Sequence, residues 1–180
     1  MIIAQEKKKE NIVEYLLYMW HIEDLIRAYS FNLENIEKEI IAKFDIDEAT
    51  YKKMYDWYDN LIQLMINEKV EEKGHIQAIQ NYVDELTRTH IFLLESPLET
   101  DYRKNFEELL PFTEDLIAKA QNKNVSLIQI FMEAIYGILL LKMKKETLSP
   151  QTQEAVEKIS RFMALLAQKY NEHENKPLQN

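Results

Sequence analysis

The chain has 180 residues, a formal charge of −9, two glycines, four prolines and no cysteine. The absence of cysteine excludes disulfides, thiolate metal sites and cysteine nucleophiles, and the acidic balance disfavours nucleic acid as a partner, because phosphate-backbone affinity needs clustered Lys and Arg. Turn residues are too few for an all-β protein and helix-favouring residues dominate, so the composition predicts an all-α fold in one domain.

The first predicted helix covers about residues 5–29. Apolar residues occupy much of its circumference, which is typical of a buried helix. A shorter helix is expected after Asn32, a common N-cap residue, with apolar side chains at helical spacing as far as Phe44.

Two further helices are expected in the middle of the chain. Asp45 and Glu48 form a capping-box pattern that predicts the start of a third helix. Gly74 interrupts the apolar periodicity, so we expect this helix to end there and a fourth to run from near His75 to Glu95.

The fifth predicted helix follows a strong start signal. Ser96 is suited to cap it, and Pro97 is suited to its first position. Its apolar periodicity continues through Pro111, which lacks the N–H group that a helix interior needs. We expect a kink at Pro111, with a complete break as the alternative.

The sixth predicted helix, about residues 125–146, is apolar on nearly every side and follows an expected turn at 122–124. A helix of this kind is normally enclosed by other helices, so we expect it to be a second buried helix. Ser149 is suited to cap the last helix, with Pro150 at its first position.

The sequence therefore predicts an all-α, single-domain bundle of about seven helices. Two buried helices, about residues 5–29 and 125–146, are expected at its centre. The bundle domain is assigned to residues 1–172, and the polar residues 173–180 are expected to form a frayed tail.

The N-terminal residues predict a cytoplasmic location. Charges begin at Glu6, before any apolar run long enough for a signal peptide. The uncharged run at 134–141 is much shorter than the roughly 20 apolar residues that cross a bilayer. We expect no membrane contact.

Several segments together resemble a known family. They are EKKKENIVEYLLYMW at 6–20, IEDLIRA at 22–28, DWY at 56–58, EKGH at 72–75, AIYGILLL at 134–141 and ISRFMALL at 159–166. As a set they are similar to a bacterial all-helical family that is labelled a domain of unknown function. The resemblance implies a helical cytoplasmic protein, and it carries over no activity, cofactor or catalytic residue.

Glu133 and Gly137 are unusual within the apolar sixth helix. Glycine inside a helix costs about 1 kcal/mol relative to alanine, so its presence beside a carboxylate indicates a close helix crossing or a small polar recess. In the first interpretation Glu133 is buried and paired with Arg27, which also has favourable spacing to pair with Glu23. In the second, Glu133 and Tyr136 face a ligand.

The histidines allow two interpretations. His90 lies on the apolar face of the fourth helix, where a histidine is usually a hydrogen-bonded core residue. The alternative is a metal site of imidazole and carboxylate ligands, drawn from His21, His90, Glu14, Asp24 and Glu133. The only Glu-x-x-His spacing, at 72–75, straddles a predicted helix boundary, which disfavours a diiron centre. We predict no metal site and no cofactor.

No catalytic motif or phosphate-binding loop is present in the sequence. The leading hypothesis is a non-enzymatic helical bundle that acts through protein contacts, for example as a homodimer, with aromatic anchors drawn from Trp20, Tyr51, Tyr55, Trp57 and Tyr58. The alternative is a bundle that binds a small ligand or metal, or an enzyme, with a polar recess around Glu133 lined by Tyr136, Arg27, His21 and His90.

Overall fold

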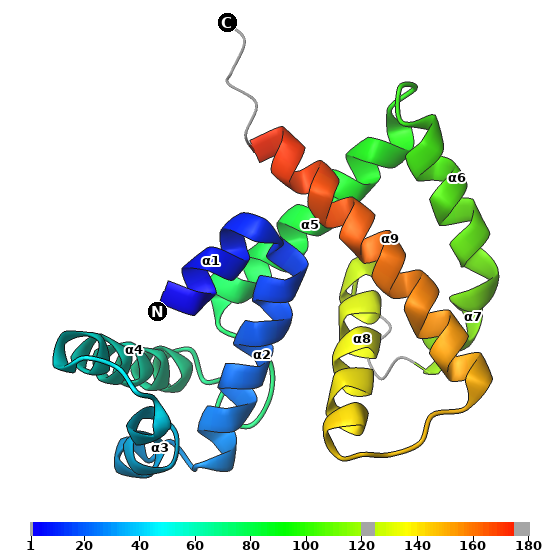
Figure 1. Ribbon diagram of the computed structural model, residues 1–180. Coiled ribbons are helices and arrows are strands. Elements are labelled where there is room, and N and C mark those ends of the chain that lie inside the picture. Colours follow the sequence, from blue (N-terminus) through cyan, green and yellow to red (C-terminus); the bar gives the residue numbers. More distant parts are fainter. Residues whose placement is uncertain (1, 120–124, 175–180) are drawn as a thin grey trace, which may run out of the picture. The chain divides into compact units, whose positions relative to one another are not determined.

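The computed structural model describes residues 2–119 and 125–174. These residues form nine α-helices and two short 3-10 helices without any β-strand, which confirms the all-α prediction (Figure 1). Nine α-helices are found where about seven were expected, because the first and the fifth predicted helices are each divided in two.

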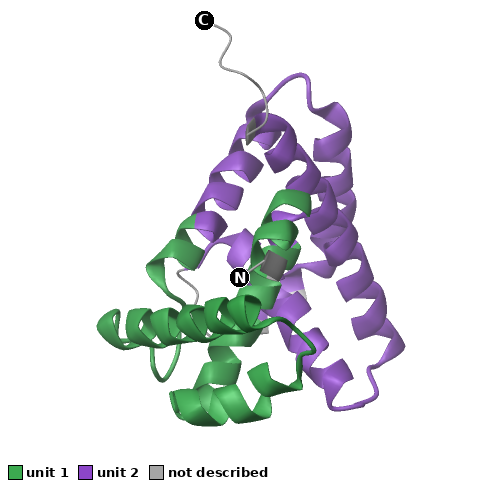
Figure 2. Cartoon of the chain, turned by 60° about the vertical axis from the view of Figure 1, so that its left-hand side comes forward, with its two compact units in different colours: residues 1–10, 14–81 green, residues 11–13, 82–180 purple. Residues whose placement is uncertain are grey.

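The chain consists of two compact units. Unit 1 comprises residues 1–10 and 14–81, and unit 2 comprises residues 11–13 and 82–180 (Figure 2). The last helix continues to Glu174, beyond the predicted end of the bundle at residue 172. The expected tail therefore falls mostly outside the described residues.

The first predicted helix is divided at Asn11. Helix α1 spans Ile2–Glu10 and α2 spans Ile12–Ala28. The Asn11 side chain accepts a hydrogen bond from the backbone N–H of Val13 at 3.0 Å, as an N-cap residue does. A single helix over residues 5–29 was therefore wrong.

The predicted cap of the next helix is confirmed. Helix α3 spans Leu33–Glu39, and the Asn32 side chain accepts from the backbone N–H of Asn35 at 2.9 Å. A 3-10 turn, η1 (Ile41–Lys43), follows directly.

Helix α4 spans Glu48–Asn67. Its cap is Asp47 rather than the predicted Asp45, and the Asp47 carboxylate accepts from the N–H of Thr50 at 2.8 Å. The helix ends several residues before Gly74, the predicted end. A loop at 68–76 follows, within which Gly74 has a positive φ of 86°.

One apolar face of α4 supplies much of the core of unit 1. Its buried side chains are Met54, Tyr58, Leu61, Ile62 and Met65. Helix α2 adds Leu16, Met19, Trp20 and Ile26, and the α3–η1 segment adds Ile36 and Ile41.

Helix α5 spans Gln77–Glu95, and its end agrees with the prediction. Helix α6 spans Thr100–Leu109 and begins later than expected. Ser96 does not cap it, because the Ser96 hydroxyl accepts instead from the N–H of Leu98 at 3.4 Å.

Pro111 breaks the fifth predicted helix. Helix α6 ends before it, a 3-10 turn η2 (Leu110–Phe112) contains it, and α7 (Glu114–Lys119) follows. The expected kink was therefore wrong and the break was right. Proline has no N–H for an α-helical hydrogen bond, so the α-helical hydrogen-bond pattern is interrupted at Pro111.

Helix α8 spans Leu127–Met143 and α9 spans Pro150–Glu174. The Ser149 cap is confirmed, since its hydroxyl accepts from the N–H of Thr152 at 3.1 Å. The expected turn at 122–124 lies outside the described residues. Within unit 2, α9 packs against both α6 and α8 (Figure 1).

Helix α8 is only partly enclosed. Residues such as Ile128, Phe131 and Met132 are buried, whereas Leu139 and Met143 are exposed. The expectation of a helix covered on every side was wrong. Among the described residues, no helix combines the length and the apolar character needed to cross a membrane.

Candidate functional sites

Glu133 lies on the exposed side of α8. Its carboxylate accepts a hydrogen bond from the side-chain amide of Gln129, one turn earlier, at 3.0 Å. A Cβ placed on Gly137 would meet no atom within 4 Å, so among the described residues no helix crosses α8 closely at this point. The predicted burial of Glu133 and the predicted crossing were both wrong. Tyr136, about one turn after Glu133 on α8, is buried.

Arg27 binds the loop at 68–76 instead of Glu133. Its guanidinium donates to the backbone carbonyls of Val70, at 3.0 Å, and of Gly74, and it forms an ion pair with Asp24 at 2.8 Å. Arg27 belongs to unit 1 and Glu133 to unit 2. The carboxylate paired with Arg27 is therefore that of Asp24, and the expected pairing with Glu23 is not formed.

Glu23 is the buried carboxylate of unit 1. Its side chain has no solvent exposure. One carboxylate oxygen accepts from the backbone N–H of Ile76 at 2.9 Å, and the other lies 2.5 Å from Nδ1 of His75. A buried carboxylate normally needs such partners on both oxygens, because an unpaired buried charge is costly.

His75 is held between Glu23 and Trp20. The imidazole and indole rings are stacked, with centroids 4.2 Å apart and 8° between their planes. Since a carboxylate only accepts hydrogen bonds, we assign a proton to Nδ1 of His75. The Glu23 carboxylate, the His75 ring and the N–H of Ile76 together form the best-defined polar cluster of unit 1.

The sequence predicted Glu23 as an intrahelical partner of Arg27, and the contact with His75 was missed. The family resemblance offered one signal for these residues. Glu23 and Arg27 lie in segment 22–28 and His75 lies in segment 72–75, and both segments are among those that resemble the family. The separation of about fifty positions along the chain concealed their contact.

His90 lies in the core of unit 2, as its apolar helix face predicted. Its Nδ1 shares a hydrogen bond of 2.7 Å with the hydroxyl of Tyr102, and its ring meets those of Phe106 and Phe162 edge to face. Burial lowers the pKa of His90 to about 4 and raises that of Tyr102. Both groups are therefore neutral at pH 7.

His21 lies on α2 and is partly buried. Its Nδ1 has no hydrogen-bond partner among the residues that the structure describes. Within residues 2–119 and 125–174, no group of three or more His, Asp or Glu side chains is arranged to hold a metal ion. The predicted ligand-binding role of Glu133, Tyr136, Arg27, His21 and His90 stays a prediction.

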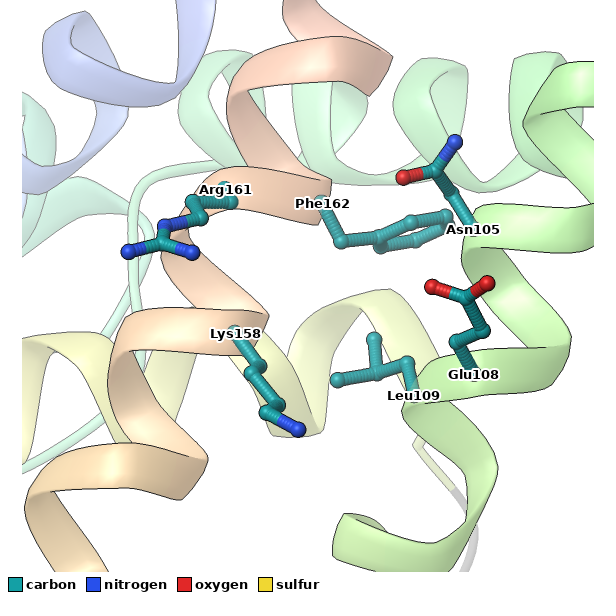
Figure 3. A pocket seen from close by; sticks show the side chains of 6 residues that line it. All are labelled: Asn105, Glu108, Leu109, Lys158, Arg161 and Phe162. Carbon is teal, nitrogen blue, oxygen red and sulfur yellow. The ribbon is translucent and has the colours of Figure 1, made fainter.

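A groove of about 280 Å³ lies between α6 and α9 (Figure 3). Phe162 and Lys158 extend from α9 toward α6, while Leu109 and Glu108 extend from α6 toward α9. Arg161 lies at the edge, with its guanidinium pointing away from α6. The remaining lining residue is Asn105.

Two of the five predicted aromatic anchors are buried, whereas Tyr51, Tyr55 and Trp57 are partly exposed. Trp20 and Tyr58 are buried, so neither is available to anchor an interface. The exposed large apolar residues include a group near the end of α5, where Ile91, Phe92 and Leu98 are 49%, 55% and 88% exposed. We call these three residues the α5 corner.

Comparison with known proteins gives a family and no function. No curated protein and no solved structure matches the chain. A family model described as "Domain of unknown function (DUF4924)" matches residues 1–176, nearly the full length. The chain, which is all-helical in its described residues, therefore belongs to the DUF4924 family.

Proposed function

We propose that the protein is a non-enzymatic helical module of the bacterial cytoplasm that acts through protein contacts, first of all with a second copy of itself. The observation that supports this most directly is the α5 corner, where three large apolar side chains are exposed. Ile91 and Phe92 are consecutive on α5, and Leu98 follows shortly after the end of the helix. Exposed apolar groups favour protein association, because association removes their surface from water.

The pattern of α5 suits a symmetric contact. Arg88, Ile91, Phe92 and Glu95 are all exposed. At 100° per residue these four positions fall within about 100° of arc on one face of the helix. The face therefore has an apolar centre with a cation one turn before it and an anion one turn after it.

Two copies of this face complement each other when the helices lie antiparallel. A twofold symmetry axis that passes between positions 91 and 92 brings Arg88 of one copy opposite Glu95 of the other. The dimer therefore contains this charge pair twice. Among the described residues, neither Arg88 nor Glu95 has an ion-pair or hydrogen-bond partner within the chain. Both are therefore available to pair across the contact, which would fix its register.

The test is the oligomeric state of charge-reversal variants, measured by sedimentation equilibrium over a dilution series. We expect the wild type to dimerise and Arg88→Glu or Glu95→Arg to weaken the dimer roughly tenfold or more, because like charges then face each other. The double variant Arg88→Glu/Glu95→Arg restores opposite charges and should restore the dimer.

Leu139→Ser on α8 is the matched control, since Leu139 is another exposed apolar residue. It should dimerise like the wild type. A wild type that stays monomeric at every concentration would overturn the proposal, and so would a dimer that none of the α5 substitutions weakens. Cell fractionation tests the proposed location, which the lack of cysteine supports.

A further inference from the structure

The groove between α6 and α9 carries opposite charges on its two sides. On α9, Lys158 and Arg161 are three residues apart and so lie on the same face of the helix. On α6, Asn105 and Glu108 have the same spacing. The α9 side therefore offers hydrogen-bond donors with positive charge, and the α6 side offers acceptors.

The acceptor character of the α6 side follows from an internal hydrogen bond. The amide nitrogen of Asn105 donates to the backbone carbonyl of Asp101 at 2.8 Å. This bond directs the nitrogen toward the helix and leaves the amide oxygen as the group for a ligand. Asn105 and Glu108 together can therefore accept hydrogen bonds from an ammonium group.

Two of the charged groups are available for a ligand. Among the residues that the structure describes, neither Glu108 nor Arg161 has an ion-pair or hydrogen-bond partner. Arg161 is exposed, so its side chain can turn toward the groove without breaking a hydrogen bond or an ion pair. Lys158 lies 3.4 Å from Glu154 and 3.9 Å from the centre of the Phe112 ring. These contacts keep its charge at the groove.

The inner surface of the groove is apolar. Phe162 and Leu109 are buried side chains that line it (Figure 3). Phe162 packs at 5.2 Å from Tyr102 and 5.5 Å from Phe106, measured between ring centroids. Such packing holds the ring in place, so the groove presents a fixed apolar surface to a ligand.

We infer that this groove binds a free α-amino acid with an aromatic or large aliphatic side chain. The carboxylate would pair with Arg161 and Lys158, the ammonium group with Glu108 and Asn105, and the side chain would lie on Phe162 and Leu109. A volume of about 280 Å³ is slightly below the usual range for ligand sites, which starts at about 300 Å³, and this restricts the groove to a small ligand such as a free amino acid. Glu108 disfavours phosphates and dicarboxylates by charge repulsion.

Three probes test the assignment by isothermal titration calorimetry on the full chain. They are L-phenylalanine, 3-phenylpropionate, which lacks the amine, and phenethylamine, which lacks the carboxylate. L-Phenylalanine should bind roughly tenfold more tightly than either, because each of the others leaves one charged side of the groove unpaired. Equal affinities for the three probes would contradict the role of the charged sides.

Variants locate the binding. Glu108→Gln and Arg161→Gln should each weaken L-phenylalanine binding roughly tenfold. Glu107→Gln and Lys104→Gln are matched controls, because both residues are exposed on α6 and neither lines the groove. They should bind like the wild type. No binding by any probe, or full binding by Glu108→Gln and Arg161→Gln, would overturn the inference.

Discussion

The imidazole of His75 lies parallel to the indole of Trp20, with ring centroids 4.2 Å apart, while its Nδ1 lies 2.5 Å from the buried carboxylate of Glu23. Helix α2 supplies Trp20 and Glu23, and the loop that leads into α5 supplies His75. One buried carboxylate thereby fixes both the ring and the adjacent backbone, through the N–H of Ile76. This contact ties the loop to α2.

Replacing Glu23 should therefore destabilise the fold. In Glu23→Gln one acceptor oxygen becomes an NH₂ group, so either Ile76 loses its acceptor or His75 changes tautomer to accept from the amide, and both hydrogen bonds lose the negative charge of their acceptor. Hydrogen bonds to buried charged groups contribute about 1.5–3 kcal/mol, and we expect a loss of that size in urea unfolding. Glu34→Gln, at an exposed position of α3, is the control and should change stability by less than about 0.5 kcal/mol.

The same variant has a spectroscopic readout. In the wild type the carboxylate favours the ring form with its proton on Nδ1, which nitrogen NMR of His75 distinguishes from the other tautomer. Glu23→Gln should shift this balance toward Nε2. A wild-type ring protonated mainly on Nε2 at high pH would contradict the assigned hydrogen bond.

Arg27→Lys should loosen the loop at 68–76. The planar guanidinium holds the carbonyls of Val70 and Gly74 and the carboxylate of Asp24 at once, which a single ammonium group cannot reproduce with the same geometry. We expect amide hydrogen exchange in this loop to become roughly tenfold faster, corresponding to about one hydrogen bond.

Lys52→Arg, at an exposed position of α4, is the control for this experiment and should leave exchange in the loop unchanged. Equal loop exchange in Arg27→Lys and in the wild type would show that Arg27 does not hold the loop.

Local sequence signals predicted most of the helices. The caps Asn32 and Ser149 were identified because a cap depends only on the backbone N–H groups of the next turn. The break at Asn11 was missed because residues 5–10 are polar residues that favour a helix, and they lead without a Gly or Pro into the apolar face that begins at Ile12. At Pro111 the continuous apolar periodicity favoured a kink, but the missing N–H ended the helix.

The sites were harder to predict because they depend on contacts between distant residues. Glu133 was predicted to be buried or to face a ligand because it is the one acid in an apolar helix, yet it lies on the exposed side of α8. Glu23 has ordinary spacing for a helix surface and is nevertheless fully buried. Hydrophobic periodicity identified the face of His90, but only the structure shows its hydrogen bond to Tyr102.

The buried state of His90 makes stability depend on pH. Burial lowers its pKa to about 4, from 6.5. Between these values the unfolded chain binds a proton that the folded chain does not. The contribution of the neutral, buried His90 to the free energy of unfolding is therefore fully present above about pH 6.5. It is lost as the pH falls toward 4. We expect wild-type stability to fall about 2 kcal/mol more than that of His90→Gln between pH 7 and pH 4.5.

Urea unfolding of both proteins at the two pH values measures this difference. His173→Gln is the matched control, because His173 is exposed near the end of α9, and it should lose as much stability as the wild type. If the wild type and His90→Gln lose the same amount, His90 is not kept neutral by burial.

The two glycines should respond in opposite ways to substitution by alanine. Gly137 lies inside α8, and a Cβ there meets no atom within 4 Å, so Gly137→Ala should stabilise the protein by about 0.5–1 kcal/mol through its helix preference. Gly74 has a φ of 86°, which L side chains rarely adopt, so Gly74→Ala should destabilise it by about 1–2 kcal/mol.

Urea unfolding of the two variants beside the wild type measures both effects, and each variant serves as the chemical control for the other, since the same methyl group is added. A destabilised Gly137→Ala would mean that a neighbouring element packs closely on α8 at this point. A neutral Gly74→Ala would mean that the loop at 68–76 relaxes to a negative φ, and its attachment through Arg27 and Glu23 would then be weaker than the hydrogen bonds indicate.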